Sequence, residues 1–346
     1  MGAGISGLTA AWRLQQAGVD VVVLEREHRP GGVIVSERPE GEGGRWVVEG
    51  GPDGWLAADG DLAALAREVG IADRMVAQAA RGTSGWDGAR LRPLAEGEAA
   101  RQLGFEVEPA ALRAGFQSFK TGMADIVEAL VAGLQADTLR RADVTTLHAT
   151  ARGYRVGDVG VEVDGVILSI APIAAGPLLR GVAVEVAGSL PHISYQPSLS
   201  VSVAYRQAQI AATLEGSGFL TAPETRDPLR ACTYASRKFP GRAPDGGDHV
   251  LLRAFLAWQD ADARSLAHAR LSSILGISGD PLWAREFRWP RGIPAYDRGH
   301  AERLAEIRTL LLAHPPLALC GSGYDGPGLT ACVRSAIAGV QYVLQR

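Results

Sequence analysis

The chain has 346 residues, of which 47% are hydrophobic and 21% charged, a balance typical of globular proteins that argues against a disordered chain. Its 35 Lys and Arg against 38 Asp and Glu leave a net charge of -3, so the sequence predicts no nucleic-acid partner, because such a partner normally requires a basic face. At about 150 residues per domain, the length predicts two domains.

Helix and strand patterns alternate at both ends of the chain, whereas the middle is rich in strands. The run Asp20–Glu25 is almost unbroken in β-branched residues, which is typical of a strand buried on both faces of a parallel sheet. In chain order, we expect helices over Leu8–Ala17, Leu62–Val69, Met123–Leu134, Asp262–Leu275, Ala301–Leu312 and Thr330 to the end, a hairpin over Trp86–Leu94, and further strands at Trp46–Glu49, within Gly153–Ile170, and at Ser198–Tyr205, Ala231–Ser236, Val250–Leu256 and Leu317–Gly321. This order predicts a nucleotide-binding domain assembled from distant segments, with a second domain inserted.

The first motif that carries chemistry is Gly2-Ala3-Gly4-Ile5-Ser6-Gly7, which fits the pattern G-x-G-x-x-G and opens a helix. In this pattern the first glycine permits a tight turn, the second lets the backbone approach a pyrophosphate, and the third lets helix and strand pack closely. The helix N-terminus then offers free N–H groups to the phosphates. Glu25 ends the next strand, where its carboxylate can accept hydrogen bonds from a ribose. Together these features predict a dinucleotide site.

The strand that normally precedes this motif is not in the sequence. It should have about five residues, yet only Met1 precedes Gly2. Either the true start of the protein lies upstream, or the central strand of the sheet is absent. We favour the first, since a sheet without its middle strand leaves unpaired backbone on both neighbouring strands.

Two further glycine-rich segments follow. Arg29-Pro30-Gly31-Gly32 comes after the predicted strand, where paired glycines suit a chain that passes close to a flat or charged ligand. Near the C-terminus, Gly321–Thr330 is a second glycine-rich turn from strand to helix, with Thr330 as the expected N-cap. Two such turns at opposite ends of one chain favour a long dinucleotide such as FAD, which would use both, over a mononucleotide.

The cysteines indicate the compartment. Cys232, Cys320 and Cys332 are too few for a disulfide framework, which favours small buried side chains in a reducing, cytoplasmic environment. We expect no signal peptide, because Met1 is followed at once by glycine and not by a basic segment, and no apolar run reaches the roughly 18 residues of a membrane span. The histidines show no metal-ligand spacing, so no metal is expected. A peripheral membrane contact is left open by the sequence.

Eight segments carry a family resemblance, in family order from end to end: GAGISGLTAAWRL at the start, RPGGVIVSE, VEGGPDGWLA at 48–57, FQSFKTGM at 116–123, GSGFLTAPE at 216–224, CTYASRKFPGRAP at 232–244, WAREFRWPRGIPAYDRGHAERL at 283–304 and GYDGPGLTACVRS at 323–335. With them the chain resembles the flavin-dependent protoporphyrinogen and coproporphyrinogen oxidases of haem synthesis, in the amine-oxidase-like flavoprotein superfamily. The resemblance implies FAD as the cofactor and a small tetrapyrrole as the substrate.

The resemblance also implies roles for individual residues. Gly218 and Leu220 sit where the family's substrate pocket is lined. The residues implied for the pyrophosphate are Gly2, Ala3, Gly4, Ile5, Ser6 and Gly7; for the adenosine ribose, Glu25 and Arg26; for the adenine, the backbone of Val144; and for the flavin side, Gly31, Gly32, Val33, Gly51, Pro52, Asp53, Gly54, Trp289, Pro327, Gly328 and Leu329. The family's flavin removes hydride from a porphyrinogen and dioxygen reoxidises it, giving hydrogen peroxide. Because the cofactor carries this chemistry, we assign no catalytic acid or base, and we expect His300 to cap the Ala301 helix.

The expected fold class is α/β. A Rossmann-like FAD-binding domain, a mixed or parallel sheet with helices, is expected from residues 1–60, 120–180 and 300–346. A β-sheet-rich substrate domain interleaves with it at 61–119 and 181–299. Family members carry a long helical block between the positions of Leu94 and Phe116, where this chain has room for at most two short helices, Glu96–Leu103 and Pro109–Phe116. The porphyrinogen pocket then lacks a wall, which affects the substrate more than the cofactor.

Three functions stay open. The family motifs favour an FAD-dependent oxidase that converts protoporphyrinogen IX or coproporphyrinogen III to the porphyrin with dioxygen as acceptor. The absent strand and helical block favour an inactive relic that binds FAD weakly or not at all. An open pocket favours a related flavin oxidase with another substrate, such as an amine, although the aromatic cage of amine oxidases is not evident near Gly328. We expect the first.

Overall fold

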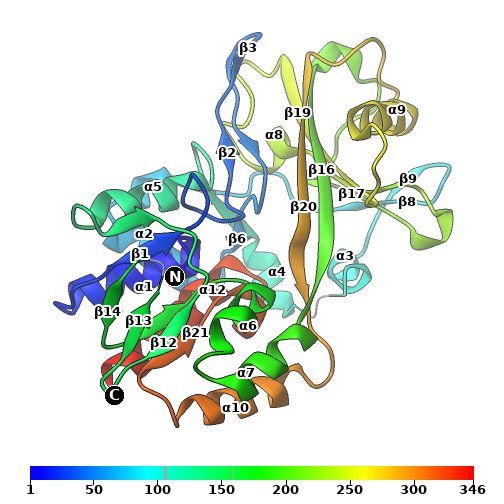
Figure 1. Ribbon diagram of the computed structural model, residues 1–346. Helices are drawn as coiled ribbons and strands as arrows, with labels where there is room; N and C mark the ends of the chain where they lie inside the picture. The colour runs from blue at the N-terminus through cyan, green and yellow to red at the C-terminus, as the bar shows by residue number, and fades with distance from the viewer. Residues whose placement is uncertain (105–106, 158) are drawn as a thin grey trace.

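The computed structural model describes residues 1–104, 107–157 and 159–346 (Figure 1). The helices are α1 (Ile5–Gln16), α2 (Gly60–Glu68), α3 (Glu98–Gln102), α4 (Pro109–Ala114), α5 (Ala124–Gly133), α6 (Pro172–Leu179), α7 (Val184–Ser189), α8 (Ala235–Lys238), α9 (Ala263–Leu275), α10 (His300–Leu311), α11 (Ser322–Asp325) and α12 (Leu329–Leu344). The strands are β1 (Val23–Glu25), β2 (Ser36–Glu37), β3 (Glu40–Gly41), β4 (Gly44–Arg45), β5 (Val48–Glu49), β6 (Trp55–Leu56), β7 (Met75–Ala77), β8 (Ser84–Trp86), β9 (Leu91–Pro93), β10 (Phe116–Phe119), β11 (Leu139–Arg141), β12 (Leu147–Ala149), β13 (Tyr154–Val156), β14 (Val161–Val163), β15 (Val166–Leu168), β16 (Ser194–Arg206), β17 (Gly218–Thr221), β18 (Leu229–Thr233), β19 (His249–Leu256), β20 (Trp283–Ala295) and β21 (Leu317–Leu319). Residues 105 and 106 of the expected 61–119 segment, and residue 158 of the strands expected within Gly153–Ile170, lie outside the described residues.

Two parallel strand pairs, β1 with β11 and β15 with β21, form the base of the α/β region. The first residues of the chain lie between these pairs. The Gly2 N–H donates to the Leu24 carbonyl at 2.8 Å, and the Ser169 N–H donates to the Met1 carbonyl at 2.9 Å. Met1–Gly2 therefore supplies backbone hydrogen bonds to both neighbours at the position where the sequence lacks a full strand. The expectation of an upstream start stays a prediction.

Helices α1 and α12 lie side by side against this base, although they come from opposite ends of the chain (Figure 1). The first half of α1, Ile5 to Ala11, is buried, and its small residues permit the close approach of α12. One hydrophobic core joins α1, α2, α5 and α12 through residues such as Leu8, Leu62, Ile126 and Val333. The two ends of the sequence thus build one structural unit.

A seven-stranded sheet in the order β20-β16-β19-β18-β17-β8-β9 forms the second region, with its long strands β16, β19 and β20 right of the centre in Figure 1. Strand β16 pairs antiparallel with β19 on one side and with β20 on the other. Helix α9 packs on this sheet, and the Asp262 side chain caps it by accepting from the Arg264 and Ser265 N–H groups. The expected hairpin is present, since β8 and β9 pair through Trp86 and Leu91.

Some expected elements differ from the structure. The strand expected from Asp20 begins only at Val23, because β11 pairs with Val23–Glu25 alone. Strand β20 was not expected. It contains Pro290 and Pro294, and the structure places it at the sheet edge, where proline is tolerated. Helices α6 and α7 were likewise not expected. Tertiary packing therefore overrides local preference at these positions.

The segment that is short compared with the family forms two short helices, α3 and α4, as expected. Mixed parallel and antiparallel sheets with helices confirm the expected α/β fold class. Within the described residues, no helix combines the length and the apolar character that crossing a membrane demands.

Candidate functional site

A cavity of about 540 Å³ lies where the N-termini of α1 and α12 face the seven-stranded sheet. It brings together most of the residues expected to hold the cofactor: Gly4, Ile5, Ser6, Gly31, Gly32, Val33, Gly51, Pro52, Gly54, Trp289, Pro327, Gly328 and Leu329. These residues come from both glycine-rich turns and from the glycine-rich segment after β1. Folding therefore joins all three segments in one site, and their binding roles stay predictions.

The three fingerprint glycines differ in what the structure demands of them. Gly2 has a φ of +90°, which residues with a side chain rarely adopt. A Cβ atom on Gly7 would lie 1.9 Å from the Gly2 carbonyl oxygen, so only glycine fits there. Gly4 has a φ of -70°, and a Cβ atom on it would meet no described atom within 4 Å. Neither backbone nor packing requires glycine at position 4, so its clearance is available to a ligand in the cavity.

Helices α1 and α12 both begin at the cavity without a capping side chain. Their N-cap residues are Gly4 and Gly328, and a Cβ atom on Gly328 would also meet no described atom within 4 Å. The Ser6 hydroxyl donates to the Cys332 carbonyl at 3.0 Å and ties the two helix starts together. The first-turn N–H groups and the positive ends of both helices are therefore directed to one cavity, which suits phosphate and other electron-rich groups. This arrangement fits FAD.

Two helix-capping expectations were wrong. Thr330 is the second residue of α12, and its buried hydroxyl has no hydrogen-bond partner in the described part of the chain. The helix begins earlier because Gly328, in an extended conformation, is its N-cap. His300 is the first residue of α10, whose N-cap is Gly299, and the His300 ring binds the Tyr324 carbonyl at 2.8 Å. That contact joins α10 to α11 beside the second glycine-rich turn.

The residues expected at the adenosine lie at the end of β1. The Glu25 carboxylate accepts hydrogen bonds from the Ala3 N–H at 2.6 Å and from the Glu27 N–H at 2.9 Å. Each carboxylate oxygen keeps a further lone pair for a ribose hydroxyl. Arg26 is exposed and pairs with Glu27 at 3.0 Å, and Val144 packs half-buried against the core near β15. The structure thus orients Glu25 through the fingerprint backbone.

The segment Gly50–Gly54 forms one wall of the cavity and is held by donors from distant elements. The Trp289 Nε1 donates to the Gly50 carbonyl at 2.7 Å, and the Arg253 Nη1 donates to the Gly51 carbonyl at 2.6 Å. A Cβ atom on Gly51 would lie 1.8 Å from the Val33 carbonyl oxygen, so this wall passes directly against Val33. The wall is fixed by β19 and β20 and not by its own sequence.

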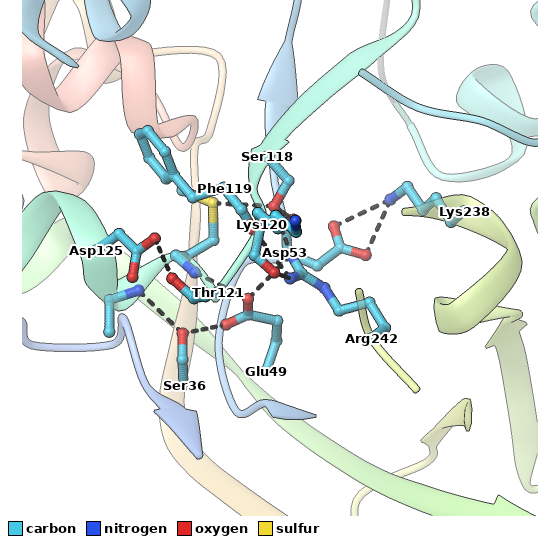
Figure 2. Close-up of polar contacts among 12 residues, drawn as sticks. Ser36, Glu49, Asp53, Ser118, Phe119, Lys120, Thr121, Asp125, Lys238 and Arg242 are labelled. Carbon is cyan, nitrogen blue, oxygen red and sulfur yellow. Dashed lines mark hydrogen bonds and ion pairs between the residues drawn. The ribbon is translucent and has the colours of Figure 1, made fainter. Parts of the chain in front are cut away.

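Beside this wall lies a cluster of buried charges, drawn in Figure 2. The Asp53 carboxylate pairs with the Lys238 Nζ at 3.0 Å through both oxygens. The Glu49 carboxylate pairs with the Arg242 guanidinium at 3.2 Å, with side chains that are 4% and 1% exposed. Arg242 also donates to the Ser118 hydroxyl at 2.6 Å and to the Phe119 carbonyl at 3.0 Å. These pairs join the strand-rich middle of the chain to its N-terminal part.

The cluster perturbs the protonation of both carboxyl groups. Burial raises the pKa of Glu49 above its usual value, although the Arg242 charge and hydrogen bonds from Ser36 and the Met123 backbone oppose this rise. Burial by itself raises the pKa of Asp53 as well, but the charge of Lys238, with those of Arg253 and Arg242, holds it below its usual value. Asp53 is therefore a structural anion.

We expect Lys238→Gln to destabilise the protein by about 1–3 kcal/mol at neutral pH, because it leaves the Asp53 carboxylate without its direct partner. A lowered pKa in the folded state adds stability above the unfolded pKa that is lost as pH falls through the folded pKa. The loss in the variant should thus shrink as pH falls below the ordinary Asp value of 3.8. Urea unfolding at a series of pH values measures this, and a loss that does not change with pH contradicts the assignment.

Other predicted residues lie elsewhere. Among the described residues, the cavity lining does not include Gly2, Ala3, Gly7, Glu25, Arg26, Asp53, Val144, Gly218 or Leu220. Gly218 and Leu220 are buried in β17, and Gly218 has a φ of +147° with the Cys232 carbonyl oxygen 2.0 Å from a Cβ atom built on it. The structure thus gives Gly218 a packing reason, and a substrate role for this pair stays a prediction.

Sequence reasoning missed the sheet side of the cavity, formed by Tyr195 and Ser198 on β16, Arg253 and Phe255 on β19, and Arg291 on β20. One signal was present: a single arginine interrupts the otherwise apolar run Val250–Leu256. In the part of the chain that the structure describes, no group of His, Cys, Asp and Glu could hold a metal ion, and the three cysteines are buried and free.

With this geometry established, we compared the chain with known proteins. Residues 1–69 match the family described as NAD(P)-binding Rossmann-like domain, and residues 88–344 match the family described as Flavin containing amine oxidoreductase. Among curated relatives, the coproporphyrinogen III oxidase of Bacillus subtilis (strain 168) is 26% identical over 249 residues, which cover 66% of this chain and 51% of that protein. The chain thus spans about half the length of that relative in the matched region.

Other relatives align over their whole length. The coproporphyrinogen III oxidase of Staphylococcus aureus is 21% identical over 470 positions, covering 99% of this chain and 98% of that protein. Because the chain has 346 residues, a large part of that relative has no counterpart here. The coproporphyrinogen III oxidase of Mycobacterium tuberculosis (strain H37Rv) is 26% identical and covers 100% of this chain and 96% of its own.

Solved structures show the same fold. A candidate protoporphyrinogen oxidase of Exiguobacterium sp. 255-15 superposes with a TM-score of 0.85 at 22% identity, covering 100% of this chain and 98% of its own. A UDP-galactopyranose mutase gives 0.74 at 15% identity, with coverage of 99% and 94%. The matched families and the two glycine-rich turns support FAD as the cofactor. The flavin family covers well over half of the residues, and the chain belongs to the flavin containing amine oxidoreductases.

Proposed function

We propose that the chain oxidises a porphyrinogen, protoporphyrinogen IX or coproporphyrinogen III, to the porphyrin with FAD as cofactor and dioxygen as acceptor. The observation that carries the proposal is the cavity in which two uncapped helix N-termini face a sheet wall of aromatic and arginine side chains. Relatives named coproporphyrinogen III oxidase and protoporphyrinogen oxidase support the substrate class. The proposed domains are residues 1–60, 120–180 and 300–346 for the cofactor, and 61–119 and 181–299 for the substrate.

In this proposal the protein binds and orients, since none of the described lining residues is a histidine, an aspartate or a glutamate. Gly4 and the first turn of α1 receive the pyrophosphate, Glu25 the ribose, and Gly328–Leu329 the flavin. FAD held by these residues would supply two-electron oxidation, and porphyrin formation would take successive oxidations of this kind, each passing two electrons and two protons from the substrate to one dioxygen to give hydrogen peroxide. The Gly50–Gly54 wall, fixed by Trp289 and Arg253, keeps the ring side of the site in place.

The visible spectrum of the purified protein tests the proposal. We expect a protein that is yellow as purified, or that stays yellow after FAD is added and unbound FAD is removed by desalting, and oxygen uptake when coproporphyrinogen III or protoporphyrinogen IX is supplied. A protein that is colourless after loading with FAD and desalting contradicts the proposal and favours the inactive relic, to which the shortness of α3 and α4 points. A yellow protein that consumes oxygen with amines and not with porphyrinogens favours a related amine oxidase.

The site of action is part of the same proposal. Three free buried cysteines suit a reducing cytoplasm. A peripheral contact with a membrane is tested by sedimentation with anionic phospholipid vesicles, in which the protein pellets only if such a contact exists.

A further inference from the structure

The cavity has two chemically different sides. One side consists of the glycine-rich turns and the starts of α1 and α12, whose N–H groups already provide for the negative charge of a pyrophosphate. The facing side, from β16, β19 and β20, contains two arginines, Arg253 and Arg291. No described lining residue is acidic. The sheet side therefore carries positive charge with no acidic side chain beside it in the cavity lining.

Arg253 is a buried cation without a direct carboxylate partner among the described residues. Its side chain is buried, with the residue 6% exposed, and the guanidinium lies 4.8 Å from the Phe255 ring centre. It donates to the Gly51 carbonyl at 2.6 Å, and to the Ser200 hydroxyl through Nε at 3.3 Å and Nη2 at 3.1 Å. An arginine has five N–H donors, so these bonds leave donors free. The nearby acids, Glu49 and Asp53, are paired with other cations.

The buried cluster beside the wall has an excess of positive charge, and buried excess charge is costly. Its cations are Lys238, Arg242 and Arg253, and its carboxylates are only Glu49 and Asp53. If Arg253 served only to hold the Gly51 carbonyl and Ser200 in place, its charge would not be required, because a neutral hydrogen-bond donor would do the same. The retained charge on the cavity wall is explained if the ligand brings the negative partner.

Arg291 is held at the same wall by a bulge. The pairing of β16 with β20 shifts register between Gln196 and Ser198, so that residues 290–292 have only residue 197 opposite them. Such bulges redirect side chains and are frequent beside active sites. A Cβ atom on Gly292 would lie 2.9 Å from the Ser198 Cβ, so glycine is what allows this close bulge. Arg291 is exposed and lines the cavity, and the described structure shows no ion pair for it.

We propose that Arg253 and Arg291 bind a carboxylate of the substrate and so select porphyrinogens by the position of their acidic side chains. This inference rests on the proposed function and specifies its substrate class. Both porphyrinogens bear propionates, but coproporphyrinogen bears further propionates where protoporphyrinogen bears vinyl groups, so coproporphyrinogen offers the arginine wall more carboxylates. A guanidinium binds a planar carboxylate through paired hydrogen bonds, a geometry that lysine cannot reproduce.

The test uses the FAD-loaded protein and two substitutions on one strand. Arg291→Gln removes the charge at the cavity, and Arg285→Gln is the matched control, because Arg285 also lies on β20 but pairs with Glu37 on the outside at 3.3 Å. We expect Arg291→Gln to weaken binding of coproporphyrin III, measured by fluorescence titration, by about tenfold. KM for coproporphyrinogen III should rise to a similar extent while kcat changes little. Arg291→Lys should recover part of the affinity.

The proposed carboxylate site is contradicted if Arg291→Gln binds coproporphyrin III like the wild type, or if Arg285→Gln loses as much affinity. It is also contradicted if Arg291→Gln loses affinity for FAD and for the porphyrin together. Arg253→Lys provides a second test, with thermal unfolding as the check that it folds: a folded variant with unchanged porphyrin affinity removes Arg253 from the wall. Failure of the proposed function looks different, because the wild type would then retain no FAD after unbound FAD is removed, or would oxidise no porphyrinogen.

Discussion

Gly4→Val is expected to fold like the wild type and to lose FAD binding by on the order of 100-fold, which corresponds to about 2.7 kcal/mol. The backbone at Gly4 has a φ of -70°, and a Cβ atom there meets no described atom, so the folded chain accommodates the side chain. The same side chain occupies the clearance in front of the first turn of α1, where the pyrophosphate is proposed to bind. The loss of a glycine N-cap adds only about 1 kcal/mol to the cost of folding.

Gly7→Val is the matched control for this prediction. A Cβ atom on Gly7 would lie 1.9 Å from the Gly2 carbonyl oxygen and 2.4 Å from the Ser169 hydroxyl, so this variant should be destabilised before any ligand is added. Thermal unfolding of the FAD-free proteins and a titration with FAD, followed by absorbance, separate the two effects. The proposed pyrophosphate site is wrong if Gly4→Val binds FAD normally, or if it unfolds as readily as Gly7→Val.

Arg242→Met is expected to destabilise the protein by about 3–5 kcal/mol, because it leaves the Glu49 carboxylate buried without its partner. The substitution also removes the hydrogen bonds that Arg242 donates to the Ser118 hydroxyl and the Phe119 carbonyl on β10. The double variant Glu49→Gln with Arg242→Met should recover part of the loss, since it removes the stranded charge. Arg155→Met is the control: it breaks the exposed pair with Glu162, and the cost should stay below about 1 kcal/mol.

The destabilisation caused by Arg242→Met is expected to depend on pH in a definite direction. Burial raises the pKa of Glu49 in the folded protein, so its contribution to stability is fully present below the ordinary value of 4.5 and is lost as pH rises through the folded pKa. Without Arg242 the folded pKa rises further. The destabilisation of Arg242→Met should therefore be small near pH 4.5 and grow toward neutral pH in urea unfolding curves. A loss of equal size at every pH would show that packing, and not charge, sets the effect.

Local sequence signals were sufficient for the cofactor side of the site. The spacing of the fingerprint predicts a turn at Gly2, a clearance at Gly4 and a close packing contact at Gly7. The structure shows a positive φ at Gly2, open space around Gly4, and backbone in direct contact with Gly7. Helix α1, hairpin β8–β9 and strand β16 were also predictable, since hydrophobic period and turn residues act over a few positions. The same is true of the shortness of the α3–α4 segment, which follows from the count of residues alone.

Other features depend on contacts between distant residues. Strand β20 contains two prolines, and only its position at the sheet edge makes it a strand. Thr330 looked like a helix cap, but the N-cap lies two residues earlier, at Gly328, which takes the extended conformation. In both cases the local preference of the residues pointed elsewhere, and the packing of neighbouring elements decided.

The sequence by itself determined the dinucleotide fingerprint, the second glycine-rich turn and the α/β class, because each is a local pattern of residue types. Only the tertiary structure decided that Arg253 and Arg291 share a wall, and that Glu49 and Asp53 find their partners in Arg242 and Lys238. Those partners lie far apart along the chain, and a charged residue in a strand does not reveal whether it will be paired. The excess of positive charge at the cavity was therefore visible only after folding had placed the other charges of the described residues around it.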